Sequence, residues 1–432
     1  MIAAYVLFGI LFLAIFLGIP IALSLGLAAL SSLVIFEPST NTAVMVQRMF
    51  TGVDSYVFMA VPFFVLAGDL MLEGGISERL VKLFKYVFWW LPASLACITT
   101  ISSAFFGAIS GSNPATVSAI GGTMIPAMKK EGYPRGLAAA IAASSGTLGV
   151  IIPPSIPMVI YGITTGVSVT KLFIGGVVPG VLLVSMLCFV NIFVCRKHKI
   201  DSKKIKQEMT AEGATFWKLL KEAIWGLMMP VIILGGIYGG FFTPTEAAVV
   251  TVFYSVFVGM FIYKELTWKK MISIIQKSAV SVGIIIFIVS AAAPFAWFLT
   301  YKGIPTAVST TILSLFSNRF IIILIMNIIM LFLGCFMSSN IIIILMAPIF
   351  LPIAAHIGLS PLALGLIMVI NTSIGNVTPP MAVNLFVATR LSGCTIGEIS
   401  KSVMPFLIAE AIFVGIISNF SGMLEWLPNL VG

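Results

Sequence analysis

Long apolar runs recur along almost the whole of this 432-residue chain. A run of about 20 apolar residues is what a helix needs to cross the hydrocarbon core of a bilayer. Hydrophobic residues make up 59% of the chain and charged residues only 9%, whereas soluble domains carry about 25% charged residues. We therefore expect an all-α polytopic membrane protein. The first run, MIAAYVLFGILFLAIFLG, has no charged start and no small-residue cleavage site, so it is interpreted as a span and not as a signal peptide.

Residue types that build several common sites are rare or scattered. The five cysteines are isolated, so neither a disulfide framework nor a zinc site is expected. The net charge of +9 comes from residues that flank apolar runs and not from a basic patch with interleaved aromatics, which disfavours nucleic acid as a partner. The two histidines, His198 and His356, cannot assemble a protease dyad or an HExxH site in the core, and no P-loop motif is present. We expect no enzyme activity.

The two halves of the chain share a pattern of polar and proline positions. The pair Ser112-Asn113 recurs 227 positions later as Ser339-Asn340. Other matches lie 224 to 232 positions apart, which indicates a duplicated unit. The first repeat is placed at 1–210 and the second at 211–432. Within them we expect scaffold helices at 1–90, an inner hairpin and broken helix at 91–195, a cytoplasmic linker at 196–221, scaffold helices at 222–318, an outer hairpin and broken helix at 319–392, and a last helix at 403–425.

Basic residues set the expected orientation. The linker carries eight of the 24 Lys and Arg and is placed in the cytoplasm. Segment 92–128 has basic residues beyond both ends, so it is predicted to enter and leave from the cytoplasm as a re-entrant hairpin; its counterpart, 320–354, enters from outside. The result is an inverted repeat of about ten transmembrane helices and two opposed hairpins, with both termini outside. Only four basic residues then lie outside the cytoplasm: Arg48, Lys171, Lys302 and Arg319.

Each hairpin is expected to have a polar tip at the depth of the membrane, at 110–114 and at 338–340. Non-helical backbone at that depth is tolerated only where protein buries it or where it lines a wet cavity. After each hairpin comes an apolar segment that glycine and a proline pair interrupt, SSGTLGVIIPPSIP and NTSIGNVTPPMAV. A proline pair removes backbone donors, so both segments should be broken helices. Paired interrupted segments in two halves are typical of the binding site of a secondary transporter, although small residues and prolines also serve only to pack or kink helices.

The broken segments offer groups for an anion and for a cation. Asn113-Pro114 and Thr378-Pro379 each predict a helix cap followed by a proline, and such helix starts present N–H groups to an anion. Unwound carbonyls and hydroxyls suit a hard cation such as Na⁺. No Lys or Arg is expected near the tips, so an anion would be met by N–H groups, serine hydroxyls and the cation. Glu246 is predicted to form a capping box, and the sequence assigns no role to Glu410.

Five stretches, taken in order, resemble one family: VPFFVLAGDLM, SGSNPATVSAIG, IIPPSIPMVIYG, GGFFTPTEAAVV and GNVTPPMAVNLF. Over nearly the whole chain they are similar to the large membrane (permease) subunit of tripartite ATP-independent periplasmic (TRAP) transporters, the DctM-like proteins of the ion-transporter superfamily. The resemblance implies an elevator-type transporter in the bacterial or archaeal inner membrane, driven by two or more Na⁺ ions. It implies uptake of an organic acid such as a C4-dicarboxylate or sialic acid. The implied partners are a small four-helix membrane subunit on a separate chain and a periplasmic substrate-binding protein.

Candidate site residues come from the tips, the broken segments and this resemblance. One Na⁺ is expected among Ser110, Gly111, Ser112, Asn113, Gly146, Gly149 and Val150, and a second among Ser338, Ser339, Asn340, Gly375 and Thr378. The substrate is expected at Ser112, Asn113, Pro114, Ala115, Ser339, Asn340, Thr378 and Pro379. Some family members carry an Asp shortly after the SGS tripeptide, where this chain has Thr116, so neutral oxygens are the expected ligands.

Two alternatives stay open from the sequence. A self-sufficient Na⁺/dicarboxylate symporter of the same superfamily would share the two hairpins and the Ser-Asn tips but would need no binding protein. The stretches FFTPTEAA and FVLAGDLM favour the TRAP permease over that symporter. A channel or a membrane scaffold protein fits the duplicated, opposed hairpins less well.

Overall fold

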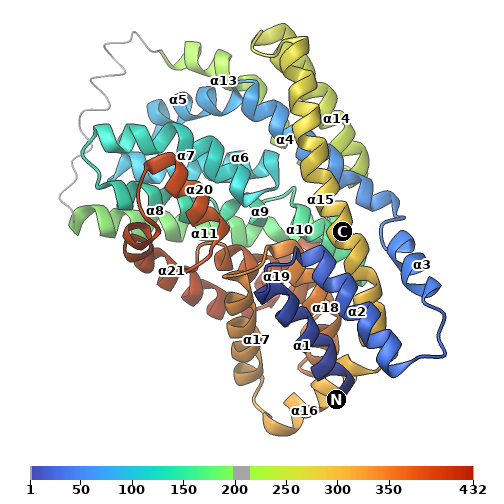
Figure 1. Cartoon of the computed structure of the whole chain (residues 1–432). Coiled ribbons are helices and arrows are strands. Elements are labelled where there is room, and N and C mark those ends of the chain that lie inside the picture. The colour runs from blue at the N-terminus through green and yellow to red at the C-terminus, as the bar shows by residue number, and fades with distance from the viewer. Residues whose placement is uncertain (1, 198–214, 432) are drawn as a thin grey trace.

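The computed structural model describes residues 2–197 and 215–431, and every regular element in those ranges is a helix (Figure 1). Seven helices of the described chain are long and apolar enough to span a membrane, and a bent pair, Arg135–Ile151 with Ile156–Thr165, would make eight. Shorter apolar helices occupy most of the other predicted spans. The chain is thus an all-α membrane protein, as predicted, while the count of ten spans stays a prediction. Most of the predicted linker, together with His198, lies outside the described residues.

The first half of the chain starts with six elements: α1 (Ile2–Phe16), α2 (Ile21–Phe36), α3 (Ala43–Thr51), the 3-10 turn η1 (Tyr56–Met59), α4 (Ala60–Glu73) and α5 (Ile76–Phe88). It continues with α6 (Ser94–Ser110), α7 (Asn113–Lys130), α8 (Arg135–Ser145), α9 (Leu148–Ile151), α10 (Ile156–Thr165) and α11 (Val169–Lys197). The pair α6–α7 is a helical hairpin at the predicted place. Because the chain is broken between α8 and α10 at the proline pair, the predicted broken helix is also present.

The second half follows the same order. It contains α13 (Phe216–Tyr238), α14 (Pro244–Phe257), the π-helical turn η2 (Val258–Ile262), α15 (Trp268–Tyr301) and α16 (Ile304–Leu315). It ends with α17 (Arg319–Gly334), α18 (Ser339–His356), α19 (Pro361–Gly375), α20 (Val383–Ser392), α21 (Ile396–Asn419) and α22 (Gly422–Val431). Hairpin α17–α18 thus matches α6–α7, and the break between α19 and α20 matches that between α8 and α10. The last predicted helix, 403–425, begins earlier because Thr395 and Glu398 form a capping box.

The helices pack as two groups. One group contains α1–α4 and α13–α15, in which α4 packs on α14 and α15, and α2 packs on α1 and α15. The other contains both hairpins and both broken segments, in which α7 and α8 pack on α20, and α10 packs on α18. In Figure 1, α2, α3, α14 and α15 lie along one side of the molecule and α6–α8, α20 and α21 lie toward the other. We call them the scaffold group and the hairpin group.

Equivalent glycines let the backbones of the hairpin group touch in both halves. A Cβ built on Gly107 of α6 would lie 2.9 Å from the Cα of Gly149 in α9. The matching contact joins Gly334 of α17 to Gly375 of α19, where a built Cβ would lie 2.6 Å from the Cα. Real Cβ atoms do not approach backbone so closely, so glycine is required at these crossings.

Matching polar contacts join the helices behind the tips. In the first half, Asn191 Nδ2 donates to Thr100 Oγ1 at 2.9 Å, and that oxygen lies 2.8 Å from Ser145 Oγ. In the second half, Asn327 and Ser418 occupy the positions 227 residues later and hydrogen bond at 3.2 Å. These side chains are buried in otherwise apolar helices, where a polar group is stable only with a partner. Both the glycine crossings and the polar contacts are those expected of a duplicated unit.

Candidate functional site

The inner tip is the turn between α6 and α7. Gly111 has left-handed backbone, φ +59°, and a Cβ there would lie 2.9 Å from the carbonyl oxygen of Pro154, so only glycine fits. The N-cap of α7 is Ser112, one position before the cap predicted at Asn113. Pro114 follows in the first turn of the helix. The Ser112 side chain makes no capping hydrogen bond within the described structure. The first N–H groups of α7 therefore have no partner in their own helix.

The outer tip is the turn between α17 and α18. Its N-cap is Ser338, whose side chain likewise makes no capping hydrogen bond in the described ranges. The Ser or Thr N-caps of α10, α14, α15, α19 and α21 each accept a backbone N–H, whereas Thr42 of α3 and Thr215 of α13 do not. The Ser339 hydroxyl accepts a hydrogen bond from Asn376 Nδ2 at 3.2 Å. Both hairpins thus turn at a serine whose helix start is left open.

Both tips line one cavity of about 380 Å³. From the predicted sites, its walls contain Ser110, Gly111, Ser112, Asn113, Pro114, Ala115 and Val150, together with Ser338, Ser339 and Asn340. The side-chain oxygens Asn113 Oδ1 and Asn340 Oδ1 are buried and have no hydrogen-bond partner among the described residues. Two polar tips that lie 227 positions apart in sequence therefore meet at one cavity, and each holds a buried side-chain oxygen without a partner in the described structure.

Other predicted site residues lie behind the cavity wall. A Cβ on Gly149 would lie 2.7 Å from Ser112 O and 2.6 Å from Thr116 Oγ1, and Ser110 Oγ lies 3.2 Å from that same hydroxyl. Neutral oxygens thus gather around Gly149, behind the inner tip. Of the other predicted glycines, Gly146 packs on Val117 of α7 and Gly375 packs on Gly334. The described residues contain no group of three or more His, Cys, Asp or Glu placed to hold a metal ion.

The predicted helix start at Thr378-Pro379 is wrong. Both residues lie in the non-helical segment between α19 and α20, and α20 begins only at Val383. Pro379 precedes a second proline, which disfavours helical backbone at Pro379, so the helix begins after the pair. Thr378 Oγ1 instead donates to Ile374 O at 3.1 Å. Neither Thr378 nor Pro379 is among the described residues that line the tip cavity.

A buried chain of hydrogen bonds joins the inner tip to the second half. Asn113 Nδ2 donates to Ser373 Oγ at 2.7 Å, and Ser373 Oγ donates to Thr147 O at 2.6 Å. Thr147 Oγ1 donates to Glu410 Oε1 at 2.8 Å, and the Glu410 side chain is fully buried. The partner of Glu410 is thus Thr147, 263 positions away, which no local pattern in the sequence reveals. Glu246 forms the predicted capping box at the start of α14.

The expectation that no cation lies near the tips is wrong. Lys277 of α15 lines the tip cavity together with Ser281 and Ile285, on the side opposite the hairpin group. These positions are spaced by four, so they share one face of the helix. Asp69 of α4 also lines the cavity, and its Oδ2 accepts a hydrogen bond from Ser278 Oγ at 2.6 Å. The distribution of basic residues predicts Lys277 in the cytoplasm. In the structure it lies within α15, nine residues beyond the first residue of the helix.

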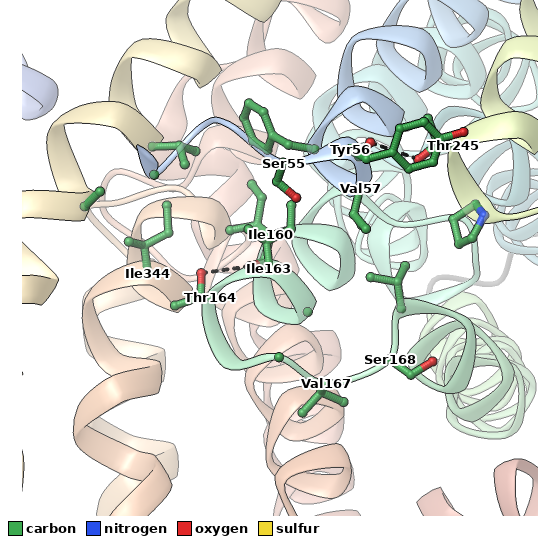
Figure 2. A pocket seen from close by; sticks show the side chains of 18 of the residues that line it. Ser55, Tyr56, Val57, Ile160, Ile163, Thr164, Val167, Ser168, Thr245 and Ile344 are labelled. Atoms are coloured by element: carbon green, nitrogen blue, oxygen red, sulfur yellow. Dashed lines mark hydrogen bonds between the residues drawn. The ribbon is translucent and has the colours of Figure 1, made fainter. Parts of the chain in front are cut away.

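A second cavity of about 760 Å³ lies along a different part of α15. Figure 2 shows Tyr56 beside Thr245, whose hydroxyl donates to the Tyr56 carbonyl at 3.2 Å, and Thr164 and Ser168 from the chain around α10. Val289, Ala293 and Ala296 of α15 line this cavity, whereas Lys277 to Ile285 line the other. Of the described residues in its walls, none belongs to either tip.

Comparison with known proteins gives concordant matches. A family model described as "Tripartite ATP-independent periplasmic transporter, DctM component" matches residues 8–423. The chain is 40% identical over 419 residues to the isethionate TRAP transporter permease protein DctMQ of Oleidesulfovibrio alaskensis, covering 96% of this chain and 64% of that protein. It therefore spans less than two thirds of that relative's length.

Two further relatives are matched almost end to end. The C4-dicarboxylate TRAP transporter large permease protein DctM of Pseudomonas aeruginosa is 38% identical, covering 95% of this chain and 94% of that protein. The sialic acid TRAP transporter large permease protein SiaM of Vibrio cholerae is 33% identical, with 96% of both covered. Among solved structures, the Alcanivorax borkumensis YdaH transporter has a TM-score of 0.63 at 14% identity, covering 88% of both chains, which shows a shared fold. The matches are to transporter components and not to enzymes.

Proposed function

The chain belongs to the DctM component family of tripartite ATP-independent periplasmic transporters, and we propose that it is the large permease subunit for Na⁺-coupled uptake of a small organic acid. The observation that carries this proposal is the tip cavity. Two hairpin tips from opposite halves line it, each at a helix start without a side-chain cap. Helix N-termini of this kind favour an anion such as a carboxylate.

Neutral oxygens around the tips support two Na⁺ sites. The first would use Ser110, the Ser112 carbonyl and the Thr116 hydroxyl around Gly149. The second would use the outer tip, where the Asn340 side-chain oxygen has no partner among the described residues. Na⁺ beside a carboxylate would offset its charge in a site where an unpaired anion is costly.

An elevator movement is supported by how the two cavities are arranged along α15. The tip cavity touches the part of α15 near its start, which basic residues place toward the cytoplasm, and the second cavity touches the outer part. Both cavities lie between the two groups, so displacing the hairpin group along the scaffold group would carry the tips toward the outer part of α15. In this arrangement the tips face the cytoplasmic side.

The partners follow from the family. We propose a small four-helix membrane subunit and a periplasmic binding protein that delivers the organic acid, in a bacterial or archaeal inner membrane with both termini of this chain outside. We propose the small subunit as a separate chain, and the relative DctMQ is longer than this chain.

A self-sufficient Na⁺/dicarboxylate symporter is the second candidate. One experiment separates the two: uptake of radiolabelled organic acids into proteoliposomes with an inward Na⁺ gradient, with and without the small subunit and the binding protein. We expect uptake only when the gradient and both partners are present. Equal uptake without the binding protein would favour the symporter, and uptake without any Na⁺ gradient would contradict the coupling.

A further inference from the structure

Lys277 is the cation of the tip cavity, and it makes no ion pair within the described chain. Two other lysines near the ends of α15 form ion pairs: Lys270 lies 3.3 Å from Glu73, and Lys302 pairs with Glu37. Lys277 lies nine residues beyond Trp268 in the helix, about 14 Å along its axis. From Ser278 to Tyr301 the helix carries no other charged residue. Lys277 is exposed in the described structure, so its ammonium can meet an incoming anion without first breaking an ion pair.

Asp69, the acid of the same cavity, makes no ion pair with Lys277 in the described structure. Among the described residues that line the cavity it is the one acid, and Ser278 donates to its carboxylate at 2.6 Å. Its side chain lies beyond ion-pair distance of Lys277, since no bridge within 4.0 Å joins them in the described structure. The neutral remainder of the wall consists of Ser, Asn, Gly and apolar residues. The cavity thus holds one lysine and one aspartate that are not ion-paired with each other in the described structure.

The tips and Lys277 stand on different groups of helices. The open helix starts of α7 and α18 belong to the hairpin group, and Lys277 belongs to the scaffold group. All line the same cavity of about 380 Å³, which is at the small end of the range for small-molecule sites, roughly 300–1,000 Å³. An anion held at the tips leaves the ammonium on the other wall unused. A compact substrate with a second anionic group would contact both the tips and the Lys277 ammonium.

We propose that Lys277 forms a second anion subsite, so that the cavity selects a small dicarboxylate over a monocarboxylate of the same length. One carboxylate lies at the open helix starts of the two tips, and the other faces the Lys277 ammonium. This inference rests on the proposed function and specifies its cargo. Because Lys277 is fixed to the scaffold group, the second contact forms only while the tips stand beside it, in the cytoplasm-facing arrangement.

The test compares succinate with butyrate, which has four carbons but one carboxylate. Both are offered to the full transporter in proteoliposomes, at a pH that ionises both succinate groups, as competitors of uptake and by direct binding. Four proteins are compared: wild type, Lys277→Gln, Lys277→Arg and Lys269→Gln. Lys269 is exposed on the same helix and does not line the cavity, so Lys269→Gln controls for the loss of one positive charge.

We expect wild type to favour succinate, and Lys277→Gln to lose succinate affinity by about tenfold or more, the loss of one charged contact. Butyrate affinity stays within about twofold, which shows that the site itself is intact. Lys277→Arg and Lys269→Gln keep the wild-type ratio. An unchanged succinate-to-butyrate ratio in Lys277→Gln would overturn the subsite alone. Absence of Na⁺-dependent uptake of any organic acid by wild type would instead overturn the proposed function.

Discussion

At the scale of single residues, the glycine crossings of the hairpin group set how closely the backbones approach. A Cβ built on Gly334 would lie 2.6 Å from the Cα of Gly375. A Cβ built on Gly415 of α21 would have no described atom within 4 Å. We predict that Gly334→Ala lowers the thermal midpoint of the purified protein, since overpacking costs about 1–3 kcal/mol. Gly415→Ala, the matched control, should leave it unchanged or slightly higher. Equal midpoints for the two variants would contradict the close crossing.

The serines at the tips are expected to act on ion coupling more than on folding. We predict that Ser112→Ala and Ser339→Ala each shift the Na⁺ activation curve of uptake to higher concentration, because each removes a hydroxyl beside a proposed cation site. Ser185 is exposed on α11 and donates to Val181 O at 3.0 Å, and it gives the control variant Ser185→Ala. Wild-type Na⁺ curves in both tip variants would show that the ions bind elsewhere.

Glu410 tests whether the buried chain behind Asn113 holds the inner tip. An ionised carboxylate without a cation is disfavoured in a dry core, so the neutral isostere should serve. We predict that Glu410→Gln keeps uptake and thermal midpoint near wild type. Glu410→Ala leaves Thr147 without its side-chain partner and opens a void, so its midpoint should fall by several degrees. A Gln variant as damaged as the Ala variant would show that the negative charge itself is required.

At the scale of elements, the hairpins were predictable because each carries its own signal. A polar tip inside an apolar stretch and a repeat in the other half locate α6–α7 and α17–α18 to within a few residues. The start of α20 could not be predicted in this way. Thr378-Pro379 has the composition of a helix cap, but the proline that follows disfavours helical backbone there. Contacts such as Asn113 to Ser373 span 260 positions, and Lys277 meets the tips only through packing of α15. Pairings of that kind depend on tertiary structure and leave no local trace in the sequence.

The hairpins also carry the prediction of sidedness. In a variant lacking the five native cysteines, a single cysteine at Lys129, in the last turn of α7, should react with an impermeant thiol reagent only from the cytoplasm. One at His356, at the exposed end of α18, should react only from the periplasm. The measurement is labelling in right-side-out and inside-out vesicles. Labelling of both positions from the same side would contradict the inverted topology.

At the scale of the whole molecule, the two halves contribute one tip each to a single cavity, and α15 of the scaffold supplies its far wall. Anion and cation would then share one small volume, so each should stabilise the other. Coupling of about 1–3 kcal/mol is usual for linked sites, which is about 5- to 150-fold in affinity. The coupling must be reciprocal, because both binding free energies belong to one cycle.

Calorimetric binding of the transported acid to the purified protein, in Na⁺ and in choline, tests most directly whether the two tips form one ion-coupled site. We predict an affinity at least about fivefold weaker in choline, and a Na⁺ affinity that rises by the same factor when the acid is present. In Ser112→Ala and in Ser339→Ala the factor should shrink, because each serine comes from one of the two tips. Equal affinity for the acid in Na⁺ and in choline would contradict an ion-coupled site at the tips.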